Sequence, residues 1–389
     1  MNHKAQNIIP YGRQEITEED IKAVIQTLQS DFLTQGPAIA EFENAFAKYV
    51  GAKYAVAVAN GTAALHLCAI ALGINEGDRV LTTPITFAAS ANCIRYCGGE
   101  VDFVDIDPDT LLIDLDKLEQ KLASKPIGYY SGVIPVDFAG YPVNLERLKK
   151  LANQFKIWII EDACHAPGGY FVDSKGEKQN CGNGQYADLA IFSFHPVKHI
   201  ATGEGGMVTT NDKELFDKIS LLRTHGITRD PNRLTKNDGG WYYEMQELGY
   251  NYRLSDMQAS LGISQLNRAD KGLERRKKIA SIYDQAFYGN ERIKIHKPAH
   301  NVGHAYHLYI IEVKDRKGLY DFLKLQNIFP QIHYIPVHLM PYYRQFGWKE
   351  NDMPVAEEYY KGCISLPMFP SLTIEEQEFV IRHILTFVN

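Results

Sequence analysis

The chain has 389 residues, of which 45% are apolar and 23% are charged, and its formal net charge is −6. This composition is typical of a globular enzyme and excludes a disordered or fibrous protein. The length is sufficient for a large domain and a smaller one, each with its own core. The most basic run, residues 275–278, falls in a helical pattern and indicates a solvated helix face, so the charge pattern does not favour nucleic-acid binding.

Cysteine usage and the N-terminal sequence indicate a cytoplasmic protein. Six cysteines are scattered along the chain, mostly among apolar residues, which predicts buried free thiols in a reducing compartment. Cys93 and Cys97 are four residues apart, but no second Cys or His pair completes a zinc site, so we expect no metal. Residues 1–10 lack the features of a signal peptide, and no apolar run is long enough to span a bilayer.

Two helices are predicted at the start of the chain, followed by alternating strands and helices. Residues 17–20 have the form of a capping box, and apolar residues at helical spacing follow it. After a break at residues 30–37, a second amphipathic helix is predicted over residues 38–49. Beyond Gly51 we expect strands over residues 55–58, 80–83, 101–106, 133–136, 157–160, 188–194 and 207–210.

Strands separated by helices of this length predict right-handed crossovers and an α/β fold with a mostly parallel seven-stranded sheet, covered on both faces. In such a sheet, ligands bind beyond the carboxyl ends of the strands. The polar motifs of this chain lie just after the predicted strands. The sequence therefore predicts one ligand site at that edge of the sheet.

The pattern changes in the last third of the chain. Long helices are predicted over residues 255–268 and 273–287, and a smaller α+β domain follows them. We therefore divide the chain into residues 1–254, an N-terminal segment plus the large domain, and residues 255–389, the linking helices and the small domain. The small domain is expected to contain strands 306–313 and 331–334, helix 317–326 and a closing helix capped by Thr373. The polar, glycine-rich segments 173–185 and 228–240 are expected to be surface loops.

A phosphate site is suggested by the motif Asn60-Gly61-Thr62-Ala63, which follows the first strand and opens a helix. Backbone N–H groups, the helix dipole and the hydroxyl of Thr62 together favour an anion there. The motif by itself is a weak signal, because Gly-Thr at a helix start is also a common structural cap.

Residues 160–166 place two carboxylates and a histidine at the end of an apolar strand. A buried carboxylate needs a cationic partner, and a protonated pyridine nitrogen facing Asp162 supplies one. An acid at a helix N-terminus without a ligand is the alternative. Phe87, at the end of the second strand, is either a ring that stacks on a flat cofactor or a core residue.

Lys198 lies between Ser193, at a strand end, and the glycine-dense loop 203–206. An amine in that setting has the geometry to form a Schiff base with an aldehyde cofactor. A lone lysine there is otherwise a solvent-facing loop residue. The phosphate motif, the aromatic ring, the acid and the lysine together are the parts that a pyridoxal phosphate site requires.

Two further segments are polar and aromatic without an assigned role. Residues 249–256 contain two tyrosines, an amide and an arginine ahead of a helix, and residues 332–338 set two histidines beside tyrosine and proline. Either segment is compatible with an interface or with structural side chains.

Taken together, these motifs resemble the DegT/StrS family of nucleotide-sugar aminotransferases, within the fold type I pyridoxal phosphate enzymes. The resemblance covers nearly the whole chain and rests on Asn60-Gly61-Thr62, residues 161–165, 193–198 and 203–206, and Asn251-Tyr252-Arg253. Residues 33–36, 243–256 and 264–266 are similar to the branch of the family that acts on a UDP-linked 4-keto-6-deoxy-N-acetylhexosamine in pseudaminic acid biosynthesis.

The resemblance implies a role for each matched residue. Lys198 is the Schiff-base lysine that also moves the proton, and Asp162 pairs with the pyridine nitrogen. The implied cofactor contacts are Gly61, Thr62, Ala63, Phe87, His165, Ser193 and, from the neighbouring subunit of a homodimer, Asn251. The positions implied near the sugar nucleotide are Tyr11, Phe32, Leu33, Thr34, His333, Tyr334 and His338. His165 replaces a glutamine of some relatives, and residues 173–185 appear as an expansion.

The implied reaction has two halves. Glutamate donates its amine to pyridoxal phosphate, which leaves 2-oxoglutarate and the pyridoxamine form, and the amine then moves to the C4 ketone of a UDP-sugar. Transfer to a TDP-sugar or to a C3 ketone is an alternative. A sugar 3-dehydratase is disfavoured by Lys198, since those relatives carry histidine at the lysine position. A non-catalytic regulator on the same scaffold is the alternative from another class.

Overall fold

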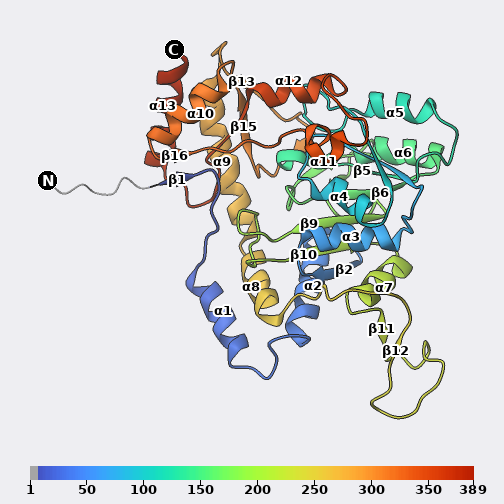
Figure 1. Cartoon of the computed structure of the whole chain (residues 1–389). Coiled ribbons are helices and arrows are strands. Elements are labelled where there is room, and N and C mark those ends of the chain that lie inside the picture. Colours follow the sequence, from blue (N-terminus) through green and yellow to red (C-terminus); the bar gives the residue numbers. More distant parts are fainter. Residues whose placement is uncertain (1–7) are drawn as a thin grey trace.

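The computed structural model describes residues 8–389, and a seven-stranded sheet lies at its centre (Figure 1). The strands run in the order β2 (Tyr54–Val58), β10 (Gly206–Thr210), β9 (Leu189–Ser193), β6 (Trp158–Asp162), β5 (Gly132–Ile134), β3 (Arg79–Thr82) and β4 (Glu100–Phe103). Neighbouring strands from β9 to β4 are parallel, while β10 is antiparallel to both of its neighbours. All seven predicted strands are present, so the α/β fold is confirmed.

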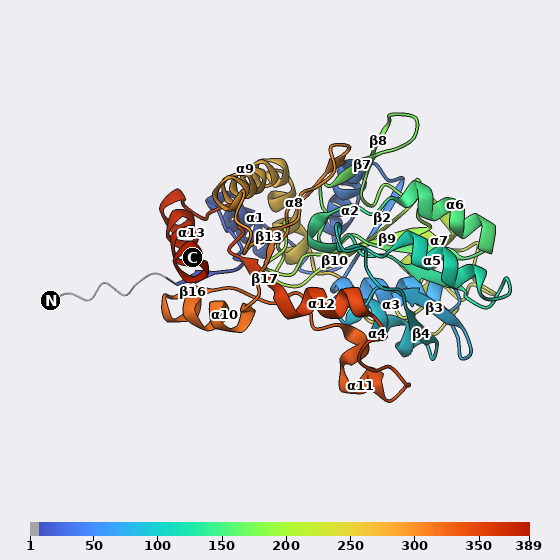
Figure 2. The ribbon, with the colours of Figure 1, turned by 90° about the horizontal axis from the view of Figure 1, so that it is seen from above.

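The sheet is covered on both faces, which explains why its strands are apolar along most of their length. Successive side chains of a strand point to opposite faces. In β2, Val56 and Val58 pack with α3 (Gly61–Ala71), α4 (Ala89–Tyr96) and α7 (Lys213–Leu222). Ala55 and Ala57 pack on the other face with α2 (Pro37–Val50) and α8 (Asp256–Leu266). Figure 2 shows α3 and α4 on one side of the strands and α2 on the other.

The first helix, α1 (Glu18–Leu28), packs against α8. Its predicted capping box is present, since the Thr17 hydroxyl accepts from the Asp20 N–H and the Asp20 carboxylate accepts from the Thr17 N–H. The remaining crossover helices are α5 (Leu115–Ala123) and α6 (Leu145–Phe155). No helix of residues 8–389 combines the length and the apolar character that a membrane span requires.

The C-terminal third forms a separate hydrophobic core around α9 (Ala269–Phe287), α10 (Arg316–Leu325) and α13 (Ile374–Val388). Strands β13 (Lys294–Ile295), β15 (Tyr309–Glu312) and β17 (Cys363–Leu366) make a small antiparallel sheet beside these helices. Strand β1 (Ile9–Pro10) pairs with β16 (Ile328–Phe329), so the N-terminal segment lies against this third. The domain boundary at residue 254 remains a prediction.

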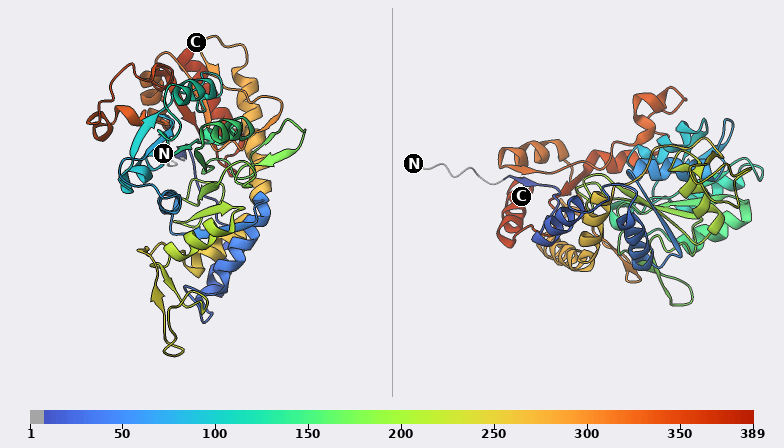
Figure 3. Two further views of the ribbon diagram at one scale, coloured as in Figure 1. Left: turned by 90° about the vertical axis from the view of Figure 1, so that its right-hand side faces the viewer. Right: turned by 90° about the horizontal axis from the view of Figure 1, so that it is seen from below.

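Short elements complete the chain. They are η1 (Phe138–Gly140), β11 (Ile227–Thr228), β12 (Glu244–Met245), η2 (Val337–Leu339), α11 (Pro341–Arg344) and α12 (Pro354–Gly362). Between β11 and β12, residues 229–243 contain no helix or strand and form an arm that extends away from the body, as Figure 3 shows (left). The expected loop at residues 228–240 is therefore confirmed, apart from its first residue in β11.

Two predictions of secondary structure were wrong, the loop over residues 173–185 and the strand over residues 331–334. Residues 173–185 are not a plain surface loop, because β7 (Tyr170–Val172) and β8 (Lys178–Asn180) form a hairpin that pairs with β14 (Val302–Gly303). Cys181 beyond the hairpin is buried, and the Gly182 N–H donates to the buried carboxylate of Glu161. The strand expected over residues 331–334 is reduced to one bridge between Gln331 and Ser365.

Candidate active site

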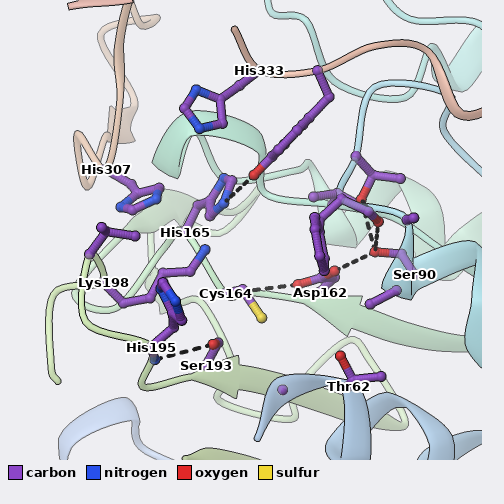
Figure 4. Close-up of a pocket in the computed structure, with 18 of the residues that line it drawn as sticks. Thr62, Ser90, Asp162, Cys164, His165, Ser193, His195, Lys198, His307 and His333 are labelled. Atoms are coloured by element: carbon purple, nitrogen blue, oxygen red, sulfur yellow. Dashed lines mark hydrogen bonds between the residues drawn. The ribbon is translucent and has the colours of Figure 1, made fainter. Parts of the chain in front are cut away.

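A cavity of about 660 Å³, here the main cavity, lies beyond the carboxyl ends of β3, β6 and β9 (Figure 4). This is the edge of the sheet at which a ligand site was predicted. The residues predicted to be functional that line it are Tyr11, Gly61, Thr62, Phe87, Asp162, His165, Ser193, Lys198, His333 and Tyr334. Side chains distant in the sequence therefore meet in one place.

Lys198 lies in a loop that is closed by hydrogen bonds to the buried residue Phe194, which directly follows β9. The Phe194 N–H donates to the Gly205 carbonyl over 2.8 Å, and the Thr202 N–H donates to the Phe194 carbonyl over 2.9 Å. The amine of Lys198 makes no hydrogen bond or ion pair with any of residues 8–389. Burial lowers its pKa below the ordinary lysine value, although Cys164 and Asp162 act in the opposite direction. A larger fraction of the amine is thus neutral and able to act as a nucleophile or base.

Asp162 is a buried carboxylate that faces the same cavity, with 5% of its surface exposed. Its Oδ2 accepts from the Ser90 hydroxyl over 2.7 Å, and its Oδ1 accepts from the Cys164 N–H over 3.2 Å. Within residues 8–389 it forms no ion pair. A buried anion without a cation is costly, so the site favours a ligand that brings a positive N–H to this carboxylate.

Two more acids lie next to Asp162, in the body of the sheet. A carboxylate oxygen of Asp137, a carboxylate oxygen of Glu161 and the Sγ of Cys181 all lie within 4.8 Å of one another, and each residue is buried. Burial raises the pKa of Asp137 to about 6 and raises that of Glu161 well above its ordinary value. The fold therefore favours the protonated form of both carboxyls, and Asp137 ionises as the pH rises through about 6.

The start of α3 forms a cradle for an anion. The Asn60 side chain caps the helix by accepting from the Ala63 N–H over 2.8 Å, so the N–H groups of Gly61 and Thr62 have no acceptor in residues 8–389. A Cβ on Gly61 would approach the Cβ of Ser193 to 3.0 Å, which is tighter than an ordinary contact, so glycine favours this close approach of α3 to β9. The cradle fits a phosphate. Ala63 itself does not line the cavity.

His165 connects the two sides of the cavity. Its Nδ1 accepts from the Ala139 N–H over 3.3 Å, and its Nε2 lies 3.3 Å from the Tyr334 hydroxyl. Burial lowers the pKa of His165 well below the usual value, so the ring is neutral with its proton on Nε2. The ring is 4.3 Å from that of His307, which also lines the cavity.

His307 and Ser90 were missed by the sequence analysis. His307 follows His304 by three residues, and that pair of histidines was the available signal. Ser90 lies in α4, and its hydrogen bond to Asp162 joins residues 72 positions apart. A contact between residues so far apart in the sequence cannot be predicted from a local sequence pattern.

Aromatic residues surround the mouth of the cavity. Phe87 is 64% exposed, and its ring lies 6.4 Å from that of Tyr334. Tyr11 lies 5.2 Å from His333, ring to ring. The Nδ1 of His333 is 2.8 Å from the Ser365 hydroxyl, and burial lowers the pKa of His333 to about 3. The mouth therefore offers flat apolar faces and neutral polar groups, which suit a sugar or a base rather than a strongly charged group.

The chain does not bring the other predicted residues to this cavity. Phe32, Leu33 and Thr34 lie between α1 and α2, and Phe32 instead borders a separate cavity beside α8. Asn251 is exposed, in a bridge with Thr224. Because the prediction placed Asn251 in the neighbouring subunit's site, its role stays a prediction.

His338 is fully buried, outside the main cavity, and bonds to Glu357 over 3.0 Å. This environment is that of a structural histidine, so its predicted contact with substrate is not supported.

Comparisons with known proteins agree with this site. The sequence profile of the DegT/DnrJ/EryC1/StrS aminotransferase family matches residues 14–385. The chain is 40% identical to the spore coat polysaccharide biosynthesis protein SpsC of Bacillus subtilis, over 100% of this chain and 99% of SpsC. It is also 40% identical to a UDP-4-amino-4,6-dideoxy-N-acetyl-beta-L-altrosamine transaminase of Campylobacter jejuni, over 96% of both chains. The structure matches the PMP form of the putative sugar aminotransferase Spr1654 from Streptococcus pneumoniae, with a TM-score of 0.89, 31% identity and coverage of 97% of this chain and 98% of that one.

Proposed function

The chain belongs to the DegT/DnrJ/EryC1/StrS aminotransferase family, and from this premise we propose that it moves the amino group of glutamate to the C4 ketone of a UDP-linked 4-keto-6-deoxy-N-acetylhexosamine. It is a pyridoxal phosphate-dependent sugar aminotransferase. The observation that carries the proposal is the meeting of Lys198, Asp162 and the α3 cradle in one cavity. The 40% identity to the altrosamine transaminase over nearly the full length supports the choice of sugar.

Pyridoxal phosphate, when bound, supplies an aldehyde that takes up amino groups and a protonated ring that accepts electrons from the substrate carbon. The chain's residues fit this group. Gly61, Thr62 and Ser193 would hold the phosphate, and Asp162 would receive the ring N–H. Phe87, at the mouth, offers an aromatic face to the ring.

Lys198 would move the protons in both halves of the reaction. Its neutral amine takes the proton from the α-carbon of glutamate, and in the second half its ammonium returns a proton to C4 of the sugar. The lowered pKa of Lys198 favours the first step, because the amine is free to accept a proton at neutral pH.

The sugar would enter past Tyr11, His333 and Tyr334. A nucleotide diphosphate carries negative charge, and Lys198 is the only lysine or arginine among the residues of 8–389 that line the main cavity. A second subunit would have to supply the countercharge. This supports a homodimer with shared sites, in which the partner brings a cation in addition to the uncharged residues Asn251 and 32–34.

The exposed apolar surface agrees with a homodimer. Ile21, Ile25 and Leu28 of α1 are each more than 40% exposed, and Trp241, Met245 and Leu248 around the arm are exposed by more than 60%. Exposed apolar side chains on α1 and around the arm are each compatible with an interaction surface. A cytoplasmic location is supported by the six cysteines, which are all unpaired.

Product identification tests the proposed function. The purified enzyme with pyridoxal phosphate and glutamate is incubated with UDP- and TDP-linked 4-keto sugars, and the products are identified by NMR. We expect a 4-amino sugar from the UDP-linked N-acetylhexosamine together with 2-oxoglutarate. Amination of the TDP-sugar alone, or of a C3 ketone, would replace the proposed substrate. Loss of the yellow colour when glutamate is added would exclude a non-catalytic regulator.

A further inference from the structure

Two hydroxyl groups lie in sequence behind the carboxylate of Asp162. The Ser90 hydroxyl donates to Asp162 Oδ2 over 2.7 Å, and the Oγ1 of Thr86 lies 2.8 Å from the Oγ of Ser90. Figure 4 shows the Ser90 side chain directed at Asp162. Ser90 has no exposed surface and Thr86 is 1% exposed, so bulk water does not compete for these bonds.

The direction of the two bonds follows from the chemistry of the groups. A hydroxyl has one hydrogen to donate, whereas an ionised carboxylate can only accept. The Ser90 hydrogen therefore goes to Asp162, because its other acceptor, the Phe87 carbonyl, is neutral and 3.4 Å away. The Oγ of Ser90 then accepts from the Thr86 hydroxyl. Donation runs from Thr86 through Ser90 to Asp162.

The same turn carries Phe87, the aromatic ring that faces the cofactor position. The Phe87 carbonyl lies 3.2 Å from the Thr86 hydroxyl and 3.2 Å from the Ser90 N–H. These bonds fix the backbone of Phe87 relative to Ser90, directly before and within the first turn of α4. One short segment thus sets both an aromatic face and a hydrogen bond to Asp162.

The carboxylate of Asp162 depends on Ser90 for its orientation. The backbone of Asp162 is fixed, since its N–H donates to Pro135 and its carbonyl accepts from the Asp137 N–H. Its Oδ1 accepts from the Cys164 N–H over a longer distance, 3.2 Å. Within residues 8–389, the side chains that donate to this carboxylate are the Ser90 hydroxyl and the Cys164 thiol, and a thiol is a weak donor.

We propose that Ser90, oriented by Thr86, is a positioning residue whose donation to Asp162 keeps the shared proton on the ring nitrogen of bound pyridoxal phosphate. The inference rests on the proposed role of Asp162 as acceptor of the ring N–H. A hydrogen bond donated to a carboxylate favours its charged form. Without Ser90 the carboxylate is a stronger base and is freer to turn, and both changes weaken its hold on a protonated ring.

The proton that is shared between the ring nitrogen and Asp162 has two positions. On the nitrogen it leaves a positive ring and a negative carboxylate, and on Asp162 it leaves two neutral groups, so the total charge is the same. The protonated ring is the form that accepts electrons from the substrate carbon. Ser90 therefore acts on the reaction through Asp162, without a contact to substrate.

A matched pair of substitutions separates this role from a general loss of stability. Ser90→Ala removes the hydroxyl from a helix, where alanine is well tolerated. Thr82→Val removes an equally buried hydroxyl, which donates to the Ile134 carbonyl over 2.8 Å and does not line the main cavity. Ser90→Thr restores the hydroxyl and is the rescue variant. Urea unfolding checks that all three variants are folded.

The ring proton is read by ¹⁵N NMR of holoenzyme that contains pyridoxal phosphate labelled at the ring nitrogen. The signal is followed against pH, and its midpoint is the pH at which the ring loses its proton. A hydrogen bond to a charged group changes such an equilibrium roughly tenfold to a hundredfold, so the midpoint should fall by about one to two pH units in Ser90→Ala. It should stay in place in Thr82→Val and return in Ser90→Thr.

The titratable groups that face Asp162 are unchanged in these variants, so they do not account for a difference among them. They are Cys93, Asp137, Glu161, Cys164, Lys198 and Tyr334.

The outcomes distinguish the role of Ser90 from that of Asp162. An equal midpoint in Ser90→Ala and the unsubstituted enzyme, or an equal fall in Thr82→Val, would overturn the role of Ser90 and leave that of Asp162 intact. An unprotonated ring in the unsubstituted holoenzyme at neutral pH would refute the proposed role of Asp162 and this inference with it. If Ser90→Ala did not fold, Ser90→Cys, with its weaker donor, should also lower the midpoint, and no change there would be contrary evidence.

Discussion

The two ends of the main cavity differ in how they are built. The cofactor end, formed by Gly61, Thr62, Asp162, Ser193 and Lys198, lies at strand ends and a helix start of one chain. The sugar end, formed by Tyr11, His333 and Tyr334, comes from segments outside regular strands and holds no lysine or arginine of its own among residues 8–389. The residues of the cofactor end thus lie on the sheet and at the start of α3, while we propose that recognition of the sugar nucleotide uses loops and a second subunit.

The largest effect is expected at the cofactor end. Lys198→Arg keeps the positive charge but removes the amine that can lose its proton, so both half-reactions should fall by at least about 10³-fold. Absorbance changes on adding glutamate measure the first half-reaction. The free energy of unfolding should be unchanged within about 1 kcal/mol, since the Lys198 amine makes no hydrogen bond or ion pair with residues 8–389. Turnover by this variant would refute the role of Lys198.

The next largest effect tests whether a second subunit completes the main cavity. Asn251→Ala should lose most activity if this residue completes the partner's site. When it is mixed with Lys198→Arg and the subunits exchange, one site of each hybrid dimer is intact, so about one quarter of the activity should return. Recovery of no activity would mean that Asn251 does not act across an interface.

A smaller loss is expected from crowding the phosphate cradle. Gly61→Ala places a Cβ 3.0 Å from that of Ser193, which should push α3 from β9 and weaken pyridoxal phosphate binding roughly tenfold. Gly272→Ala is the control, because its Cβ meets nothing closer than 3.6 Å. Cofactor affinity is measured by fluorescence titration. Equal affinities in the two variants would show that the close approach is not part of the cradle.

Stability should depend on pH through the acids beside Asp162. The pKa of Asp137 is raised to about 6 in the folded chain, so its contribution is fully present below about pH 4 and is lost as pH rises through 6. Asp137→Asn should remove that part of the dependence, a difference on the order of 1–3 kcal/mol between pH 5 and 8. Urea unfolding of both proteins across this range measures it. Parallel curves would mean that Asp137 is ionised throughout.

The smallest effect on activity is expected at His338. This residue is fully buried and bonded to Glu357, so His338→Ala should lower stability by about 1–3 kcal/mol. The KM for the sugar nucleotide should not change, because the side chain does not line the main cavity. A raised KM with unchanged stability would instead support the contact between His338 and substrate that the sequence resemblance implied.

The sequence predicted the cofactor end much better than the sugar end. Seven apolar runs separated by helices define a parallel sheet, and such a sheet dictates where Asp162 and Lys198 meet. Ser90 and His307 were not predicted because they reach the site through packing between elements far apart in the chain. The hairpin over residues 170–180 was mistaken for a loop, since its strands are short and its pairing with β14 is non-local.

Borohydride reduction of the holoenzyme, followed by peptide mapping, tests the central assignment most directly. Reduction fixes the cofactor to the amine that carries it. The structure predicts that the label lies on Lys198, in the peptide that also contains His199. Label on another lysine, or none after reduction of the yellow enzyme, would contradict the account of the cofactor end and of every step assigned to Lys198.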